Sequence, residues 1–393
     1  MKRIEGRAQR YAWGSTSDIP TLLGIPVTDE PYAEHWYGAH ESAPSFVDGF
    51  PLDARLRDDP DLLGTDVASR FGGRLPYLMK LLSAAHPLSI QAHPNATEAA
   101  DGFARENAAG IPLDAAHRTY RDSWAKPECV IALTEFHGLC GFRNPVVTAD
   151  LFDGLGVASQ LATVIGPLTQ RKGAAALAEV FLDVLSLDGE RLALVDVVVE
   201  AARHHVDDPG ELGLFARTAL ELDDQHHGDR GVLAALLLNR FQLDPGEGIF
   251  LPPGNMHAYL RGFAIEVMAN SDNVLRGGLT AKHIDVDALL AVVRFSAEQP
   301  EAMSADVLGD GIVHYRTHAD EFTVWRVETS LKPVLLPGSA ARIVLATSGE
   351  IALTTLRTAE SVTLRQGEAA FVPASETPMI SGAGTAFVAA PGI

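Results

Sequence analysis

Residues 246–257 read GEGIFLPPGNMH, an apolar run that leads from Gly246 into a Pro-Pro-Gly turn and ends on His257. This order is typical of a strand that enters a tight turn and carries the next polar side chain inward. The same spacing recurs from Gly367: a glycine, five residues, a proline, one residue, a small residue and two further residues. This second copy ends on Pro378 and not on a histidine. The repeat predicts two related β-rich units, of which only the first can hold a metal at this position.

The surrounding sequence favours short strands over long helices. Strand-like AIEVMA (264–269) follows the opening stretch, and alternating apolar segments continue at 322–328, 341–349, 350–356, 368–374 and 385–390. Short strands at regular spacing with turn signals between them indicate a barrel or jelly roll. The first 145 residues have a similar β-rich composition with one clear helix, which a capping box of Asn95 and Glu98 starts and Gly110 ends. A second helix is expected at 285–295.

Residues 146–240 have a different character. Leu and Ala recur at helical spacing, as in AAALAEVFLDVLSL and ELGLFARTALELDD, which predicts a block of amphipathic helices. The sequence therefore predicts a mainly β protein with a helical insertion.

Composition limits the possible partners and the location. A chain of 393 residues with 47% apolar side chains can form two or three domains. The net charge of −20 argues against nucleic acid and anionic membranes as partners. Two cysteines give no disulfide framework, the N-terminus has no apolar signal core, and no apolar run reaches the roughly 20 residues of a membrane span. A soluble protein of a reducing, cytoplasmic compartment is expected.

The densest group of polar residues begins in SIQAHP. Side chains two apart in a strand share a face, so Ser89, Gln91 and His93 point the same way, as do Lys126 and Glu128 in KPECV. Together with the histidine at the end of the opening stretch, these segments offer four nitrogen and oxygen ligands of the kind zinc accepts. They are Gln91, His93, Glu128 and His257. The alternative is that each is a separately satisfied polar residue of a loop or core.

A second group occupies AIEVMANSDNVLRGGLTAKH (264–283). Glu266 points a carboxylate to one face of an apolar strand, and Arg276 lies beside two glycines, an arrangement suited to an oxyanion or phosphate. Thr280 and Lys282 could extend this anion site, while a solvated turn with a surface arginine is the alternative. The paired histidines at 204–205 and 226–227 are expected on the surface of the helical block.

Several motifs together resemble the type I mannose-6-phosphate isomerases, zinc enzymes of the cupin superfamily. They are YAWGS, PYAEHWYGAHESAPS, PYLMKLLSAAHPLSIQAHPN, KPE, FHGLCGFRNP, GNMHAYL and IEVMANSDNVLRGGLTAKH, in order from Tyr11 to about Asp285. The resemblance implies two cupin (jelly-roll) barrels plus an α-helical domain. The corresponding divisions are a catalytic cupin at 1–145 and 241–312, a helical insertion at 146–240 and a metal-free cupin-like barrel at 313–393.

The resemblance also implies roles for individual residues. One zinc per chain would be held by Gln91, His93, Glu128 and His257. Arg276 would be the catalytic arginine, with Glu266 and Lys126 as alternative bases near C1 and C2, and the substrate pocket would include Ser89, Lys80, Lys282 and Tyr259. Three of the six lysines, Lys80, Lys126 and Lys282, fall within these motifs. The chain departs from the family at Trp124-Ala125 before the KPE motif and at Ala281 and His283 around the last lysine.

The implied activity is the interconversion of mannose 6-phosphate and fructose 6-phosphate through an enediol. Isomerisation of another sugar phosphate such as glucose 6-phosphate is a close alternative, because no residue of the sequence indicates which configuration at C2 the site accepts. A non-catalytic sugar-binding cupin and an iron bicupin oxygenase are more distant alternatives, since all four ligands are present and the arginine suits a phosphate. The expected partner is a small sugar phosphate, and the expected state is a monomer or weak homo-oligomer.

Overall fold

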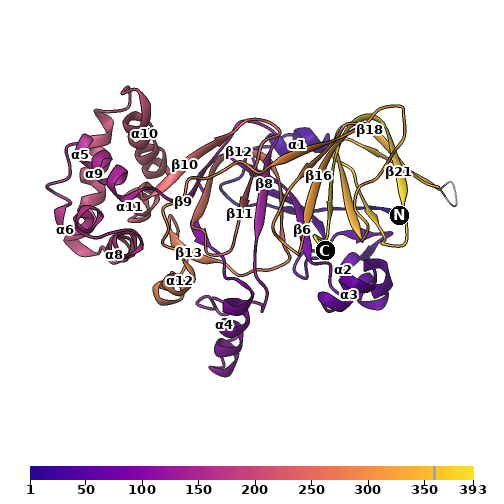
Figure 1. Ribbon diagram of the computed structural model, residues 1–393, viewed down its shortest axis with the longest axis horizontal. Helices are drawn as coiled ribbons and strands as arrows, with labels where there is room; N and C mark the ends of the chain where they lie inside the picture. Colours follow the sequence, from indigo (N-terminus) through magenta and orange to yellow (C-terminus); the bar gives the residue numbers. More distant parts are fainter. Residues whose placement is uncertain (357–359) are drawn as a thin grey trace.

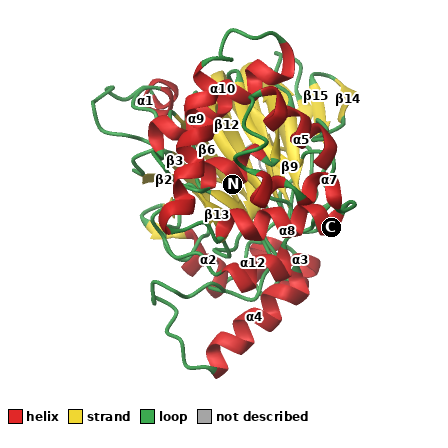
Figure 2. Ribbon diagram, turned by 90° about the vertical axis from the view of Figure 1, so that its left-hand side faces the viewer, coloured by secondary structure: helices red, strands yellow, loops and turns green. Residues whose placement is uncertain are grey.

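The computed structural model describes residues 1–356 and 360–393. Three parts follow one another along its long axis: a block of helices at one end, a ten-stranded sheet in the middle and a nine-stranded sheet at the other end (Figure 1). Seen from the helical end, the helices of the block lie in front of the strands (Figure 2). A mainly β fold with a helical block is confirmed, whereas two closed barrels are not shown.

The middle sheet carries the residues of interest. Its strands follow the order β10-β9-β12-β6-β3-β2, with β11, β8, β7 and β13 attached beside this path. Their bounds are β2 Arg7–Gln9, β3 Glu34–Gly38, β6 Tyr77–Ala84, β7 Ile90–Ala92, β8 Glu128–Ala132, β9 Phe136–Phe142, β10 Leu238–Leu243, β11 Gly248–Leu251, β12 His257–Ala269 and β13 Leu275–Gly278.

The nine-stranded sheet follows the order β1-β20-β18-β21-β16-β15-β14. Its strands are β1 Lys2–Ile4, β14 Ala305–Gly309, β15 Ile312–Tyr315, β16 Thr323–Glu328, β17 Val334–Leu335, β18 Arg342–Thr355, β19 Ser361–Arg365, β20 Ala369–Val372 and β21 Pro378–Ala390. The strand β1 pairs with β20, and β14 pairs with β15. Sheet membership thus differs from the expected divisions, because the chain start and residues 305–309 join the C-terminal sheet through backbone pairing that composition does not reveal.

The repeat predicted from Gly246 and Gly367 is present in the structure. Each copy is a four-residue strand, a turn and a thirteen-residue strand, namely β11 and β12 in the first copy and β20 and β21 in the second. His257 and Pro378 occupy the same place, the first residue of the long strand. Gly246 and Gly367 both have positive φ, of 91° and 83°, which is the backbone conformation that glycine adopts most easily.

The pleat of β6 and β12 sorts their side chains between core and pocket. Met79 and Leu81 of β6, like Ile265 and Val267 of β12, pack into the core that joins the two sheets, where Ile343 and Phe387 meet them. The residues between them face the other way and line the pocket described below. Because Lys80 is the register partner of Glu266, these two charged side chains lie side by side on the pocket face.

The structure contains the helices that the sequence predicted. The capping box of Asn95 and Glu98 is present and starts α4 (Ala96–Ala108), and α12 (Val286–Val292) is a shorter form of the helix expected at 285–295. The predicted helical block contains α5 Pro145–Gly154, α6 Ala162–Ile165, α7 Pro167–Gln170, α8 Ala174–Leu185, α9 Ala193–Arg203, α10 Gly210–Gln225 and α11 Gly231–Leu236. Among the described residues, no helix combines the length and the apolar character that a bilayer crossing needs.

Two local predictions were wrong. The expectation of a single helix in the first 145 residues missed α1 (Asp18–Leu23), α2 (Leu52–Asp58) and α3 (Thr65–Arg70), which are too short to show a clear period. The strands expected at 341–349 and 350–356 are one continuous strand, β18, whose register shifts between Ala346 and Ser348. Gly349 resembled a turn signal in the sequence, but the ladder to β21 continues through it.

We expect the stability of the fold to fall below neutral pH partly because of His35 on β3. Burial lowers the pKa of this imidazole from 6.5 to about 4. Between these two pH values the unfolded chain binds more protons than the folded chain. The contribution of His35 to the free energy of unfolding is therefore fully present above pH 6.5 and is lost as the pH falls through this window. Within this window, His35 should lower the free energy of unfolding by up to about 1.4 kcal/mol for each pH unit of acidification.

The measurement is urea unfolding at pH 7 and pH 5 for the wild type and for His35→Gln, which can still hydrogen-bond to the Tyr32 hydroxyl 2.7 Å from Nδ1. His204→Gln at the exposed end of α9 is the matched control. An unchanged pH slope in His35→Gln would show that this imidazole does not carry the effect.

Candidate functional site

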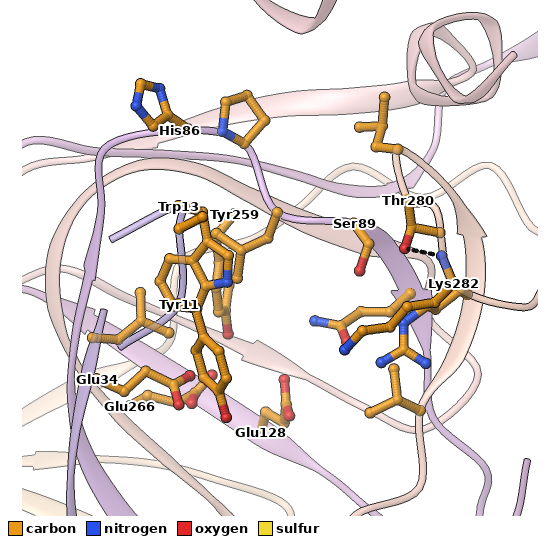
Figure 3. A pocket seen from close by; sticks show the side chains of 18 of the residues that line it. Tyr11, Trp13, Glu34, His86, Ser89, Glu128, Tyr259, Glu266, Thr280 and Lys282 are labelled. Carbon is orange, nitrogen blue, oxygen red and sulfur yellow. Dashed lines mark hydrogen bonds between the residues drawn. The ribbon is translucent and has the colours of Figure 1, made fainter. Parts of the chain in front are cut away.

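A pocket of about 690 Å³ opens on the face of the middle sheet that points away from the C-terminal sheet. Strands β3, β6, β7 and β12 form its floor, the N-terminal loop with Tyr11 and Trp13 forms one wall, and residues 279–282 after β13 form the opposite wall. In Figure 3, Glu34, Glu266 and the two aromatic residues lie to one side of Glu128, and Ser89, Thr280 and Lys282 lie to the other. The pocket thus has two differently charged halves with Glu128 between them.

Three buried ligand-type side chains converge behind the part of the pocket lining that Glu128 forms. His93, Glu128 and His257 place their nitrogen and oxygen atoms within 4.8 Å of one another. The Nε2 atoms of His93 and His257 lie 3.3 and 3.4 Å from the two carboxylate oxygens of Glu128. Ligand atoms of a tetrahedral zinc with bonds of about 2.0–2.1 Å are roughly 3.4 Å apart, so this spacing fits such an ion.

The hydrogen bonding of the two imidazoles prepares the same atoms for a metal. His93 directs Nδ1 at the carbonyl oxygen of Asn273 at 2.7 Å, and His257 directs Nδ1 at that of Asn255 at 3.1 Å. Such bonds hold the proton on Nδ1 and leave a lone pair on Nε2. Among the described residues, neither Nε2 atom nor Oε2 of Glu128 has a hydrogen-bond partner. Buried polar atoms without partners are costly, and a bound cation would satisfy all three.

The charge states of these groups also suit a metal. Burial, reinforced by the nearby Lys126, lowers the pKa of His93 to about 4, which keeps the imidazole neutral near pH 7. Burial alone would raise the pKa of Glu128, but Lys126 and the two histidines hold it well below its usual range. The Lys126 ammonium lies 3.0 Å from a Glu128 oxygen. The site therefore presents His93 as a neutral imidazole and Glu128 as a carboxylate, the forms in which these side chains bind metal.

Gln91, the fourth expected ligand, lies on β7 between the other parts of the site. It is the register partner of His257 on β12 and of Arg276 on β13, and its side chain lines the pocket. The strand pairing therefore places the Gln91 amide next to His257 and Arg276. Gln91 and Glu128 thus line the pocket, and the two histidines contact Glu128 from outside the pocket lining.

The acidic half of the pocket is built around Lys80. Its ammonium lies 2.7 Å from Glu266 and 3.6 Å from Glu34, and all three side chains are buried. Burial alone would lower the pKa of Lys80, but these carboxylates raise it, so the lysine stays charged. Burial also raises the pKa of Glu266. Lys80 lines the pocket between Glu34 and Glu266, two carboxylates that lie on the side of Glu128 opposite Lys282 (Figure 3).

Tyr259 lies on β12 in the same half of the pocket. Its hydroxyl is buried, and in the described structure it has no hydrogen-bond partner. Burial, together with Glu266 and Glu128, raises the pKa of this phenol well above its ordinary value, so the group remains a neutral donor. A neutral, unpartnered hydroxyl that faces a pocket is free to donate to a bound ligand.

The opposite half of the pocket carries three cations, of which one was not foreseen. Arg276 and Lys282 were expected here, and Arg121 joins them. Within residues 1–356 and 360–393, none of the three lies within ion-pair distance of a carboxylate, and burial together with mutual repulsion lowers the pKa of Arg276 and of Lys282. We call Arg121, Arg276 and Lys282 the cation wall. Three cations without acidic partners are suited to an anionic group such as a phosphate.

The turn at Ser271–Asn273 links the ligand cluster to the segment that carries Arg121. The side chain of Asn273 accepts from the backbone N–H of Arg121 at 2.7 Å and donates to the carbonyl oxygens of Asp122 and Trp124 at 2.9 Å. The backbone carbonyl of Asn273 is the acceptor that orients His93. One buried asparagine therefore fixes a metal-ligand candidate and the segment that carries Arg121 and Lys126.

Sequence reasoning missed Arg121 and His226. Arg121 lies only five residues before Lys126 of the KPE segment, so its proximity in sequence to a candidate ligand was a usable signal. His226 was expected on the surface, but it follows α10 and lines the pocket with its Nε2 atom 3.4 Å from the carbonyl oxygen of Pro87. Only the packing of the helical block against the sheet brings this histidine to the pocket.

A buried ligand cluster beside an anion-binding wall points to a metal-dependent enzyme that acts on a small anionic molecule. Comparison with known proteins makes the assignment specific. Residues 1–145 match the family model of the type I phosphomannose isomerase catalytic domain. The mannose-6-phosphate isomerase of Escherichia coli is 37% identical over 387 residues, which cover 96% of each chain, and that of Homo sapiens is 31% identical over 94% of this chain and 92% of its own.

Solved structures agree with this similarity. A phosphomannose isomerase from Salmonella typhimurium superposes over the whole of both chains with a TM-score of 0.90 at 35% identity. A mannose 6-phosphate isomerase bound with zinc and yttrium gives a TM-score of 0.89 at 35% identity, again over both whole chains. The chain belongs to the type I phosphomannose isomerase family.

Proposed function

We propose that the protein is a zinc-dependent isomerase that interconverts mannose 6-phosphate and fructose 6-phosphate. The observation that carries the proposal is one pocket with a ligand cluster for a metal behind Glu128 and, on one wall, three cations that have no ion-pair partner among the described residues. The cluster would hold zinc through His93, Glu128 and His257, with Gln91 beside them. The named relatives support the choice of sugar phosphate.

Isomerisation moves a proton between C1 and C2 through an enediol. When bound, zinc supplies Lewis-acid polarisation of the substrate carbonyl. The cation wall would hold the phosphate, and Arg276 would also face the oxyanion that develops on the sugar. Glu266 and Lys126 are the two candidate bases. Burial raises the pKa of Glu266, and a shift in this direction favours it as the base because it makes the carboxylate more basic.

The test is a coupled assay for fructose 6-phosphate formed from mannose 6-phosphate, with glucose 6-phosphate as the competing substrate. Each substrate is measured before and after chelator treatment and again after zinc is restored. We expect turnover of mannose 6-phosphate that chelation removes and zinc restores. Preferred turnover of glucose 6-phosphate would assign the close alternative, and full activity in demonstrably metal-free protein would rule out the zinc.

Arg121→Ala is expected to raise KM for mannose 6-phosphate by about tenfold to a hundredfold, because a charged hydrogen bond contributes roughly 1.5–3 kcal/mol. The value of kcat should change less than threefold, since the guanidinium would hold the phosphate and not the reacting carbons. Arg217→Ala in the helical block, outside the pocket, is the control. A loss confined to kcat would contradict a phosphate-holding role, and Arg121→Lys should recover part of the affinity.

The finer structural and cellular statements are part of the same proposal. We infer that the two sheets are two jelly rolls of the cupin type, supported by the repeated strand-turn-strand unit and by β12, whose first half pairs with β7 and β9 and whose second half pairs with β6 and β8. We also infer one zinc per chain, which the single ligand cluster found among the described residues supports. A cytoplasmic monomer or weak homo-oligomer remains our expectation, which light scattering and cell fractionation would test.

A further inference from the structure

The loop that follows β13 carries Lys282 of the cation wall and begins in a strained conformation. Leu279, its first residue, has a φ of 54°, in the left-handed region that is unfavourable for a bulky side chain. Among the described residues, the other non-glycine residues with positive φ are Asp48 and Asp310, and aspartate adopts this conformation more easily. Contacts with the rest of the protein must therefore hold the loop in place.

These contacts come from the helical block. In the connection between α10 and α11, the Asp229 carboxylate accepts the backbone N–H of Thr280 at 3.3 Å through Oδ2 and that of Gly231 at 2.6 Å through Oδ1. The Thr280 hydroxyl in turn accepts the backbone N–H of Lys282 at 3.1 Å (Figure 3). The Leu279 side chain is buried in the core that the block shares with the sheet. One carboxylate thus ties the start of α11 to the loop with Lys282.

The backbone around Asp229 is itself fixed. Its N–H donates to the carbonyl oxygen of His226 at 2.9 Å, and its carbonyl oxygen accepts from the N–H of Val232 at 2.9 Å. Gly231 and Gly278 approach so closely that a Cβ atom on Gly278 would come within 2.5 Å of the Gly231 Cα atom. The carboxylate therefore projects from a rigid support that lies directly against the end of β13.

We propose that Asp229 is a positioning residue for phosphate binding, because it holds the loop at Thr280 so that Lys282 reaches the phosphate end of the pocket. This inference rests on the proposed function in one respect, since it takes the anion at the cation wall to be the substrate phosphate. Asp229 does not line the pocket, so it acts through Lys282 and not by touching the substrate. Loss of the carboxylate should weaken phosphate binding and leave the chemical step unchanged.

The decisive variant is Asp229→Asn, which keeps the size of the side chain and removes one acceptor. Its single carbonyl oxygen would stay on the closer Gly231 N–H, and its NH2 group would face the Thr280 N–H. We expect KM for mannose 6-phosphate to rise about tenfold, as for the loss of one charged hydrogen bond, with kcat within threefold of the wild type. A purely electrostatic role predicts the opposite sign, because removal of a negative charge near the cation wall would tighten phosphate binding.

A double variant tests whether the effect passes through Lys282. Lys282→Ala should raise KM about tenfold, and the addition of Asp229→Asn should then raise it less than twofold further, whereas a general loss of structure would multiply the two effects. Asp223→Asn is the matched control, because this buried carboxylate accepts the backbone N–H of Gly228 at 3.0 Å and its hydrogen bonds stay within the helical block. It should leave KM within twofold of the wild type.

Two measurements need no turnover. Hydrogen exchange of the Thr280 amide should be at least tenfold faster in Asp229→Asn and unchanged in Asp223→Asn. Calorimetric titration of the metal-loaded protein with inorganic phosphate should show at least threefold weaker binding in Asp229→Asn only. Unchanged exchange, unchanged phosphate affinity, or effects of Asp229→Asn and Lys282→Ala that multiply would each overturn the positioning role.

These outcomes are separate from that of the isomerase assay. An active wild type whose KM and phosphate affinity are unaltered by Asp229→Asn would overturn the positioning role alone. A wild type without isomerase activity whose phosphate affinity still falls in this variant would retain the positioning role and lose only the proposed function.

Discussion

His257→Ala is expected to abolish metal binding and to lower turnover of mannose 6-phosphate by about 10³-fold or more. The side chain supplies one of the converging atoms that lack hydrogen-bond partners, and its Nε2 atom lies 3.4 Å from Glu128. Lewis-acid polarisation contributes several kcal/mol to such a reaction, and each 1.4 kcal/mol corresponds to about tenfold in rate. Metal analysis of the purified variant and the coupled assay measure the two effects separately.

The matched control is His205→Ala in the helical block. This histidine also contacts a carboxylate, with Nδ1 2.7 Å from Asp208, but it lies outside the pocket. Its removal should leave metal content and turnover within twofold of the wild type. Stoichiometric zinc with full activity in His257→Ala would show that the cluster is not the metal site.

Glu266→Gln is expected to lower kcat by about 10²–10⁴-fold while the metal remains bound, because this is the usual contribution of a positioned base. The substitution keeps the shape of the side chain and removes its ability to accept a proton. With C2-deuterated substrate, the residual reaction should be limited by proton removal and should show a primary isotope effect. A kcat within threefold of the wild type would transfer the role to Lys126, the other candidate.

Glu34→Gln separates the loss of a base from the loss of a partner for Lys80. Glu34 lies 3.6 Å from the same ammonium and accepts the Trp36 indole N–H at 2.7 Å. If Glu266 acts only by balancing the buried lysine, both variants should lose activity to a similar degree. If Glu266 is the base, Glu34→Gln should retain kcat within about tenfold and should show no new isotope effect.

Local sequence patterns predicted much of the fold because they depend on neighbours along the chain. The capping box at Asn95, the helical period of residues 146–240 and the turn frame from Gly246 are all local signals, and the structure shows each of them. Short helices such as α1–α3 lack enough turns to display a period, and Gly349 looks like a turn where tertiary pairing continues the strand. Pairing of β1 with β20 joins the two ends of the chain, which no local pattern can report.

For the candidate site, alternation along a strand predicted which side chains share a face. Ser89 with Gln91 and Lys126 with Glu128 do line one pocket. The sequence did not show how these faces combine, because the register between β6 and β12 decides that Lys80 lies against Glu266 and away from Lys282. The position of His226 at the pocket likewise depends on packing between distant segments.

The sequence by itself determined the kinds of chemical group available, their spacing within each strand and the family to which they belong. Only the tertiary structure decided which groups meet. It placed two imidazoles and a carboxylate at the spacing of metal ligands, enclosed Lys80 between two carboxylates, and gathered three cations on one pocket wall with no acidic partner among the described residues. The physical reason is that charge, burial and distance between residues far apart in the chain are fixed by strand register and side-chain packing, not by composition.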